Sequence, residues 1–582
     1  MALGNIAPRS KLSSVAASLA LASLLATGCA ANVGDLSVFR DDSGGGVGTG
    51  TGTAYYPDDP CGGAMGGGSA QGGGILPPAS DAERAIAEAD VVQIVGDRLY
   101  ALSAASGLSL IDVSVRDQLV LLDQEATAGY PLEMYADGAT VHVLVDHGID
   151  QHFSEVLSFG VANGSDLQLR DSLELPGHLS DSRRVGDVLY LVSYETHDCV
   201  DCPNRPTTTI TSVNVAHSAV LLQIDELQYQ QSYVDDLGWK RSVTVTPERM
   251  YVAGVEWDGV STDGHSTIQV VDISDPTGDL VEGASVAAAG QILNRWQMDE
   301  HEGVLRVLSQ PGVWATDAVP TVQTFSVVSS QQLVPLGSMD LTLPTPESLR
   351  TVRFDGDRVY AITAQPAEPY DPTPGAEVEA PPPLDGCGYM CDPLFVIDLS
   401  DPSSPVQLGS LEMPGWVFHI EPRGTKLYAL GFEATYPLGL LSVSLFDVED
   451  MTQPELLSRV TFGGEWSGLS EDQNRIHKSF SVREDLGLIL VPYGWWQWQE
   501  EFVCGGECGD CWDDGYWYRQ GAVQLIDIGA DELLARGAAY MASWARRARI
   551  HDTRLLAVSE DEVASFDIGN RDQPLQTSAL DL

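Results

Sequence analysis

Basic residues are scarce in this sequence, and their scarcity limits what the protein can bind. Only 31 lysines and arginines stand against 83 acidic residues among 582, which gives a formal net charge of −52. A surface of that sign repels nucleic acid phosphates and anionic lipid head groups, so we expect no nucleic-acid partner. The acidity indicates a solvated surface that keeps the protein soluble, with cation binding as the functional alternative.

Catalytic motifs are missing as well. The sequence holds no GxSxG elbow, no HExxH pair and no Gly-rich phosphate loop between a strand and a helix. The eleven histidines are scattered, and the pair His477–Lys478 is the only place among them that we single out for testing. We therefore predict no catalytic residue, and a binding function is favoured over an enzymatic one.

Long apolar runs are limited to one stretch near the N-terminus. VAASLALASLLAT follows Arg9 and Lys11 and has about the length of a signal peptide, too short to predict a membrane span. Its end, LLATGC, resembles a bacterial lipobox, which implies that residues 1–28 are a lipoprotein signal peptide and that Cys29 is lipidated. Ala30 implies, by analogy, the outer membrane. The alternative is ordinary signal cleavage a few residues later. In the lipoprotein interpretation, the exported protein contacts the membrane by its lipid anchor only.

Residues 29–80 are rich in glycine and poor in strand pattern. Such a composition is typical of a flexible coil, so we expect a tether between the anchor and the folded part. The segment from Ser80 to Asp90 then predicts one or two helical turns, with Ser80 as the N-cap.

From residue 81 to 582 one unit recurs nine times. Each copy contains a strand such as GDRLYALS or GDRVYAIT, and alignment of these strands places the following residues at one position: Tyr100, His142, Tyr190, Tyr251, Arg306, Tyr360, Tyr428, Ile489 and Leu556. A second strand ends in apolar–apolar–Asp–apolar in six units, with Asp112, Asp272, Asp398, Asp447, Asp527 and Asp567. Three units carry degenerate versions of it.

Four short strands in a repeat of roughly 55 residues are typical of a β-propeller. We predict an all-β fold: a single large β-propeller over 81–582 with eight or nine four-stranded antiparallel blades. Two smaller propellers or sandwiches are the alternative, but no linker-like segment interrupts the repeats. The recurring aspartates are expected to form turns. Calcium binding in the channel is the other interpretation, and we predict no cofactor.

Several motifs resemble those of the secreted β-propeller domain proteins of bacteria and archaea. They are ADVVQIVGDRLYALS, DPLFVIDLSDPSSPVQLGSLEMPG, LSLFDVEDMTQPELLSRVTFGG and the IHKSF around His477. These proteins are distantly similar to tryptophan–aspartate-repeat propellers, and the repeats also resemble the LVIVD type of bacterial surface proteins. The resemblance implies the fold and export, and it carries no catalytic residues.

Three insertions in the repeats, near 196–208, 365–393 and 494–520, contain seven of the nine cysteines. If Cys29 is lipidated, an even number remains, which favours disulfides in an exported protein. Cys199–Cys202 and Cys387–Cys391 are expected to be local pairs, and one of the trio Cys504, Cys508 and Cys511 could reach Cys61. Zinc held by His197 with its cysteine pair, or by the trio, is the alternative.

The third insertion is rich in aromatic residues, which suit stacking on sugars or gripping a partner peptide. The candidate binding residues are Trp495, Trp496, Trp498, Trp512, Trp517 and Tyr518. The alternative is that these rings pack on one another and on the propeller.

Together these features predict a lipid-anchored platform for a protein or glycan at the cell envelope. A hydrolase or oxidoreductase with its site in the central channel and an envelope scaffold are the alternatives.

Overall fold

The computed structural model describes residues 86–582 with gaps at 149–150, 196–205, 217–219, 231–240, 257–264, 311–318, 344–346, 365–392, 414, 434–439, 465–466 and 506–509. The side chains of residues 256 and 499–517 also lie outside the description. No helix within the described part is long and apolar enough to cross a membrane.

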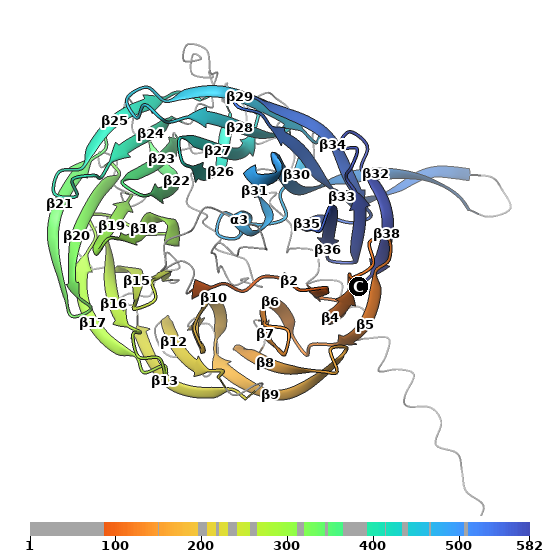
Figure 1. Ribbon diagram of the computed structural model, residues 1–582, viewed down its shortest axis with the longest axis horizontal. Coiled ribbons are helices and arrows are strands. Elements are labelled where there is room, and N and C mark those ends of the chain that lie inside the picture. The colour runs from red at the N-terminus through yellow and green to blue at the C-terminus, as the bar shows by residue number, and fades with distance from the viewer. Residues whose placement is uncertain are drawn as a thin grey trace, which may run out of the picture. The chain divides into compact units, whose positions relative to one another are not determined.

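The described residues form nine antiparallel sheets arranged as the blades of one ring (Figure 1). The prediction of a single large β-propeller is therefore confirmed, with nine blades. The first blade consists of β2 (Val92–Val95), β3 (Arg98–Ser103), β4 (Gly107–Asp112) and β5 (Val120–Glu125), and the second of β6 (Tyr130–Ala136), β7 (Thr140–Asp146), β8 (Phe153–Ala162) and β9 (Asp166–Pro176). The third consists of β10 (His178–Val185), β11 (Val188–Glu195), β12 (Thr207–Asn214) and β13 (Leu222–Gln230), and the fourth of β14 (Ser242–Val245), β15 (Arg249–Glu256), β16 (His265–Asp272) and β17 (Val281–Ala287). The fifth consists of β18 (Met298–His301), β19 (Val304–Ser309), β20 (Thr321–Ser329) and β21 (Gln332–Asp340).

The other four blades follow the same order from the centre to the rim. The sixth blade consists of β22 (Ser348–Asp355), β23 (Arg358–Ala364), β24 (Leu394–Asp398) and β25 (Val406–Leu411), and the seventh of β26 (Trp416–Arg423), β27 (Lys426–Phe432), β28 (Leu441–Asp447) and β29 (Glu455–Phe462). The eighth consists of β30 (Ser467–Gly468), β31 (Ser481–Arg483), β32 (Leu488–Gly505), β33 (Asp510–Ile528) and β34 (Leu533–Met541). The ninth consists of β35 (Ala545–His551), β36 (Arg554–Ser559), β37 (Glu562–Asp567) and β38 (Leu575–Asp581).

The second and third strands of each blade form the core. In the first blade, β3 and β4 are buried almost throughout, whereas the outermost strand β5 alternates with solvent. The inner pair is covered on both faces by the neighbouring blades, so its sequence is a nearly continuous apolar run. This burial explains why these two strands carry the repeat signal and the outer strands do not.

The recurring aromatic position lies at the junction between blades. The side chains at that position are buried in all nine copies. Three of its tyrosines reach the next blade or its inner loop: Tyr190 donates to the carbonyl of Ile273 at 3.3 Å, Tyr251 to Glu300 at 2.6 Å and Tyr428 to Glu484 at 3.1 Å. The position therefore repeats because it joins each blade to its neighbour.

The recurring aspartates form turns, as predicted, in five of six copies. Asp112, for example, accepts a hydrogen bond from the Ser114 backbone at 2.8 Å, and Asp398 accepts one from Ser400 at 2.8 Å. The same i to i+2 bond occurs at Asp272, Asp447 and Asp567. Asp527 departs from the pattern because its carboxylate binds Arg536 and Arg571 instead.

Three short segments fill the centre of the ring. The first begins with β1 (Ile86–Ala87), which pairs with β10 on the inner edge of the third blade. Residues 86–87 are thus a strand and not the expected helical turn, because the backbone groups of this segment bond to inner strands. The second is the 3-10 turn η2 (Arg295–Gln297), and the third is the single helical turn α3 (Ile476–Ser479), visible near the middle of Figure 1.

Within the described residues the ring closes without exchange of strands, because every blade takes its four main strands from one stretch of chain. Leu556, Val558 and Val563 of the last blade join the apolar cluster of the first two blades. The buried guanidinium of Arg554 donates to three carbonyls of the first blade, among them that of Val115 at 2.8 Å. Side chains therefore hold the first and last blades together.

Candidate functional site

The centre of the ring gathers charged side chains from several blades. The whole chain has 31 basic and 83 acidic residues, but at the centre the cationic and anionic side chains are nearly equal in number. The carboxylates are Glu88, Asp90, Glu133, Asp181, Glu421, Glu471 and Asp472. The cations are Arg183, Arg295, Arg353, Arg475, Lys478, Arg546, Arg547 and Arg549.

Asp90 is the best-connected carboxylate of this centre. It is 1% exposed, and its Oδ1 accepts a hydrogen bond from Arg547 Nε at 2.7 Å while its Oδ2 binds Arg549. Arg547 also binds Glu471, which comes from the loop before α3. The N-terminal segment, the eighth blade and the ninth blade are thus joined by one buried ionic network.

The motif His477–Lys478 lies on α3 inside the ring. Lys478 is 4% exposed, and its Nζ lies 2.5 Å from Glu133 Oε1. His477 Nε2 lies 3.7 Å from Glu88 Oε2, and its ring meets Trp296 edge-on with centroids 5.2 Å apart. Both residues therefore tie α3 to inner strands and to the N-terminal segment.

Glu88 and Asp90 are held in their charged form, whereas burial raises the pKa of Asp181 and Asp472 above the ordinary value. Burial raises the pKa of Glu88, but Arg295 and Arg183 outweigh it, and the net pKa lies below the ordinary value. The pKa of Asp90 is likewise lowered, because Arg547 and Arg549 outweigh its burial. Burial lowers the pKa of His477 far below its usual range, so the ring is neutral. Carboxylates and a histidine are thus present at the centre, but among the described residues Arg or Lys side chains bind all of these carboxylates except Asp472.

A second cluster at the centre surrounds Trp296. The guanidinium carbon of Arg353 lies 3.3 Å from the centroid of the indole, and that of Arg295 lies 3.9 Å from it. Arg353 donates to His419 Nδ1 at 2.9 Å, and His419 Nε2 lies 3.7 Å from Glu421. Burial and the neighbouring Arg353 lower the pKa of His419 to about 4, so His419 accepts this hydrogen bond as a neutral ring.

The aromatic insertion forms a long hairpin of β32 and β33 that projects from the rim of the ring (Figure 1). Only the root of β32 pairs with the inner strands β30 and β31, at Gly494–Trp495 and Leu488–Leu490. Beyond residue 495 the described pairing is that of a two-stranded ribbon, with Trp498 opposite Trp517 and Gln497 opposite Tyr518.

The predicted binding residues differ in exposure. Trp495 and Trp496 are partly buried at the root of the hairpin, and Trp498 is 45% exposed. Trp495 lies edge-on to Tyr540, and Trp496 lies edge-on to Trp544. Tyr518 is partly buried, and the side chains of Trp512 and Trp517 lie outside the described residues. Packing on the propeller therefore accounts for Trp495 and Trp496, whereas Trp498 faces solvent.

Trp544 anchors the hairpin to the ring. It is 9% exposed, and its Nε1 donates to the Trp495 carbonyl at 3.2 Å. Its indole lies so close to Gly494 that an added Cβ there would be 2.2 Å from Trp544 Cδ1. The root of the hairpin therefore requires glycine at this position. Tyr540, which lies edge-on to Trp495 at this root, is 65% exposed.

The cysteines are described only in part. Cys29, Cys61, Cys199, Cys202, Cys387, Cys391 and Cys508 lie outside the described residues, and Cys504 and Cys511 are described by backbone alone. The strand register places Cys504 directly opposite Cys511. Among the described residues, no three His, Cys, Asp or Glu side chains gather as a metal site would require.

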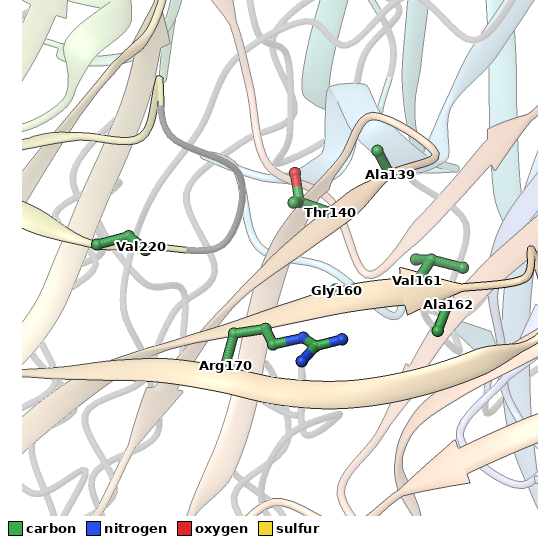
Figure 2. A pocket seen from close by; sticks show the side chains of 7 residues that line it. All are labelled: Ala139, Thr140, Gly160, Val161, Ala162, Arg170 and Val220. Carbon is green, nitrogen blue, oxygen red and sulfur yellow. The ribbon is translucent and has the colours of Figure 1, made fainter.

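A hollow of about 500 Å³ opens between the second and third blades. Its lining consists of small residues of the second blade, together with Arg170 and Val220 (Figure 2). Arg170 donates to Gln168. Apart from Arg170 and the hydroxyl of Thr140, the described lining is apolar and holds no acid–base pair.

The ring centre was not predicted from the sequence, although a signal for it exists. The rare basic residues concentrate in the innermost strands and the links before them, for example in LRTVRFD at 349–355 and ARRARIH at 545–551. In an acidic chain, such a concentration at inner-strand positions marks the side chains that face the ring centre.

Nine blades around a filled centre define the protein as a β-propeller. Residues 82–370 and 389–570 match the profile of the Beta propeller domain family, and the chain belongs to this family. An uncharacterised protein of Methanocaldococcus jannaschii is 30% identical over 215 residues, which are 37% of this chain and 29% of that protein. One from Archaeoglobus fulgidus is 28% identical over 207 residues, 35% of this chain and 27% of that one. The matched region thus spans less than a third of either relative. The solved periplasmic gluconolactonase of Pseudomonas aeruginosa is 12% identical, with a TM-score of 0.35 over 63% of this chain and 96% of that one.

Proposed function

We propose that the protein is an exported, lipid-anchored binding platform of the cell envelope, and that its aromatic hairpin contacts a protein or a glycan. The observation that carries this proposal is the projecting hairpin itself. It leaves the ring as a two-stranded ribbon and carries Trp498, which is 45% exposed, and at its root Tyr540, beside Trp495, is 65% exposed. Large exposed rings on a soluble surface are typical of contact sites for sugars and proteins.

The ring supports the hairpin as a rigid base. Tyr493, Trp495 and Trp544 fix its root through ring contacts and a hydrogen bond, and we infer that this fixed root positions the ring of Trp498. Binding by a positioned aromatic side chain loses less conformational entropy than binding by a flexible loop. The tether of residues 29–80 and the lipid on Cys29 complete the proposal, because they would hold this platform at the membrane surface.

The test compares Trp498→Ala and Tyr540→Ala with the unaltered protein. The purified mature protein is applied to an array of envelope glycans and, in parallel, is used to capture envelope proteins. We expect both substitutions to weaken the same interaction at least tenfold, because each removes an exposed ring. Leu575→Ala is the control, since Leu575 is an equally exposed apolar residue (66%) on β38 of the ninth blade. Equal binding by all four proteins would contradict the proposal.

A further inference from the structure

Arg353 is a buried cation that forms no ion pair with a carboxylate of the described residues. It lies on β22 and is 7% exposed. Its NH2 donates to His419 Nδ1 at 2.9 Å and its NH1 to the Val352 carbonyl at 3.0 Å, both of which are neutral acceptors. Within the described part of the chain, no carboxylate oxygen lies within 4.0 Å of its guanidinium. A guanidinium carries five N–H donors and keeps its charge, so this group is only partly satisfied.

Arg295 adds a second cation on the same indole. Its NH1 lies 3.1 Å from Glu88 Oε1, and its Nε is buried without a hydrogen-bond partner. Glu88 is shared, because Arg183 Nε lies 3.5 Å from the same oxygen. Among the described ion pairs, Arg295 contacts Glu88, and Arg183 contacts Glu88 and Asp181. None of these pairs includes Arg353, although the charge of Glu421 acts on it from a greater distance.

Trp296 supplies a third donor. Its Nε1 is buried and has no hydrogen-bond partner, although its indole is partly exposed to solvent. The residue is held by the capping box of η2, in which Asn294 accepts from the Trp296 backbone at 3.0 Å. An indole N–H, the Nε–H of Arg295 and the remaining N–H groups of Arg353 therefore belong to side chains that gather around one indole.

We propose that this cluster, formed by Arg295, Trp296 and Arg353, binds a small oxyanion, that is, the carboxylate or phosphate group of a small molecule. Guanidinium forks recognise planar and tetrahedral oxyanions through paired N–H bonds, and the indole contributes one further donor. A cation or an uncharged apolar ligand would leave these donors without acceptors, which is costly in a buried place.

The electrostatics of the cluster agree with this assignment. Burial lowers the pKa of Arg353 far below its usual range, and the Arg295 charge lowers it further. Burial also lowers the pKa of Arg295, to about 10. A bound anion would oppose the lowering of the Arg353 pKa, because it would add to the negative charge of Glu421, which already raises this pKa.

The test is a thermal-shift and calorimetric titration of the full mature protein in chloride buffer at constant ionic strength. The probes are inorganic phosphate, acetate and citrate. We expect a saturable rise in melting temperature with at least one of them, and the comparison of phosphate with the two carboxylates identifies the recognised group. Arg353→Met should weaken the binding at least tenfold. Trp296→Phe, which keeps a stacking ring and removes only the N–H, should weaken it severalfold.

Arg98→Met is the matched control. Arg98 pairs with Asp112 at 2.7 Å on the first blade, and its loss removes the same charge away from the cluster. Binding in Arg98→Met should equal that of the unaltered protein. If no probe binds the unaltered protein, or if all three variants respond alike, the proposal is wrong. Should Arg353→Met fail to fold, the anion affinities of Trp296→Phe and Arg98→Met are compared. Weaker binding by Trp296→Phe supports the proposal, and equal binding by the two variants contradicts it.

Discussion

Arg547 and Asp90 lie 457 positions apart in the sequence, yet Arg547 Nε lies 2.7 Å from Asp90 Oδ1 in the centre of the ring. Asp90 immediately precedes the first blade, and Arg547 stands on the inner strand of the last one. Because the described strands show no exchange between the two ends of the ring, this buried ion pair joins them where a shared strand would otherwise do so.

We predict that Asp90→Asn destabilises the protein by about 3–5 kcal/mol, since it leaves Arg547 and Arg549 buried without their shared carboxylate. The measurement is the free energy of unfolding in urea at neutral pH. Asp117→Asn, which removes an exposed carboxylate from a turn of the first blade, is the control and should change stability little. An Asp90→Asn protein as stable as the control would show that the ion pair does not secure the closure.

The fold could be predicted because its signal is repeated. Tyr100, Tyr251 and their equivalents recur for one physical reason, the junction between blades, so each copy reinforces the others. Asp398 and its equivalents recur because a turn needs a side-chain acceptor there. The segment at Ile86–Ala87 was predicted wrongly as a helix. Its strand partner on β10 lies a hundred residues away, and local sequence does not report such pairing.

The site could be predicted less well, for two reasons. The aromatic hairpin was visible as a cluster of tryptophans, but its sequence does not separate the packed Trp496 from the exposed Trp498. That difference depends on Trp544, which comes from the link between two blades. The cluster around Trp296 joins residues of the fifth, sixth and seventh blades, and those residues occupy no shared position in the repeat.

The root of the hairpin offers a second prediction. Gly494→Ala should destabilise the protein by about 1–3 kcal/mol, because the new methyl group would overlap the Trp544 indole. Urea unfolding and tryptophan fluorescence measure the effect. Gly464→Ala is the control, because it is the same substitution at a place where the added Cβ meets no atom within 4 Å. Equal stability of the two variants would mean that Trp544 does not pack on Gly494.

The acid sensitivity of the fold can be tested at His142. Burial lowers its folded pKa to about 4, whereas an unfolded histidine titrates near 6.5. The unfolded chain therefore binds the proton first, and stability falls as the pH drops from about 6.5 to about 4. One such group contributes up to about 1.4 kcal/mol per pH unit. His142→Leu, which places there the residue type of Leu556, should flatten the dependence by this amount. An unchanged pH profile would contradict the burial of a neutral ring.

The lipid anchor remains a prediction of the sequence and has a direct test. Cys29→Ala should move the protein from the membrane to the soluble fraction, because the thiol that would carry the lipid is lost. Fractionation of cell extracts measures this. Cys61→Ala removes a cysteine from the same tether and should leave the protein on the membrane. Membrane association of Cys29→Ala would rule out the anchor.

The central claim is that the hairpin is the contact surface of the propeller. Its most direct test places a photo-reactive phenylalanine derivative at position 498 in one variant and at position 575 in another, and irradiates intact cells that express each protein. Both positions are exposed, at 45% and 66%. The account predicts a discrete cross-linked protein or glycan adduct from position 498 and none from position 575. Adducts from position 575 alone, or from neither position, would contradict it.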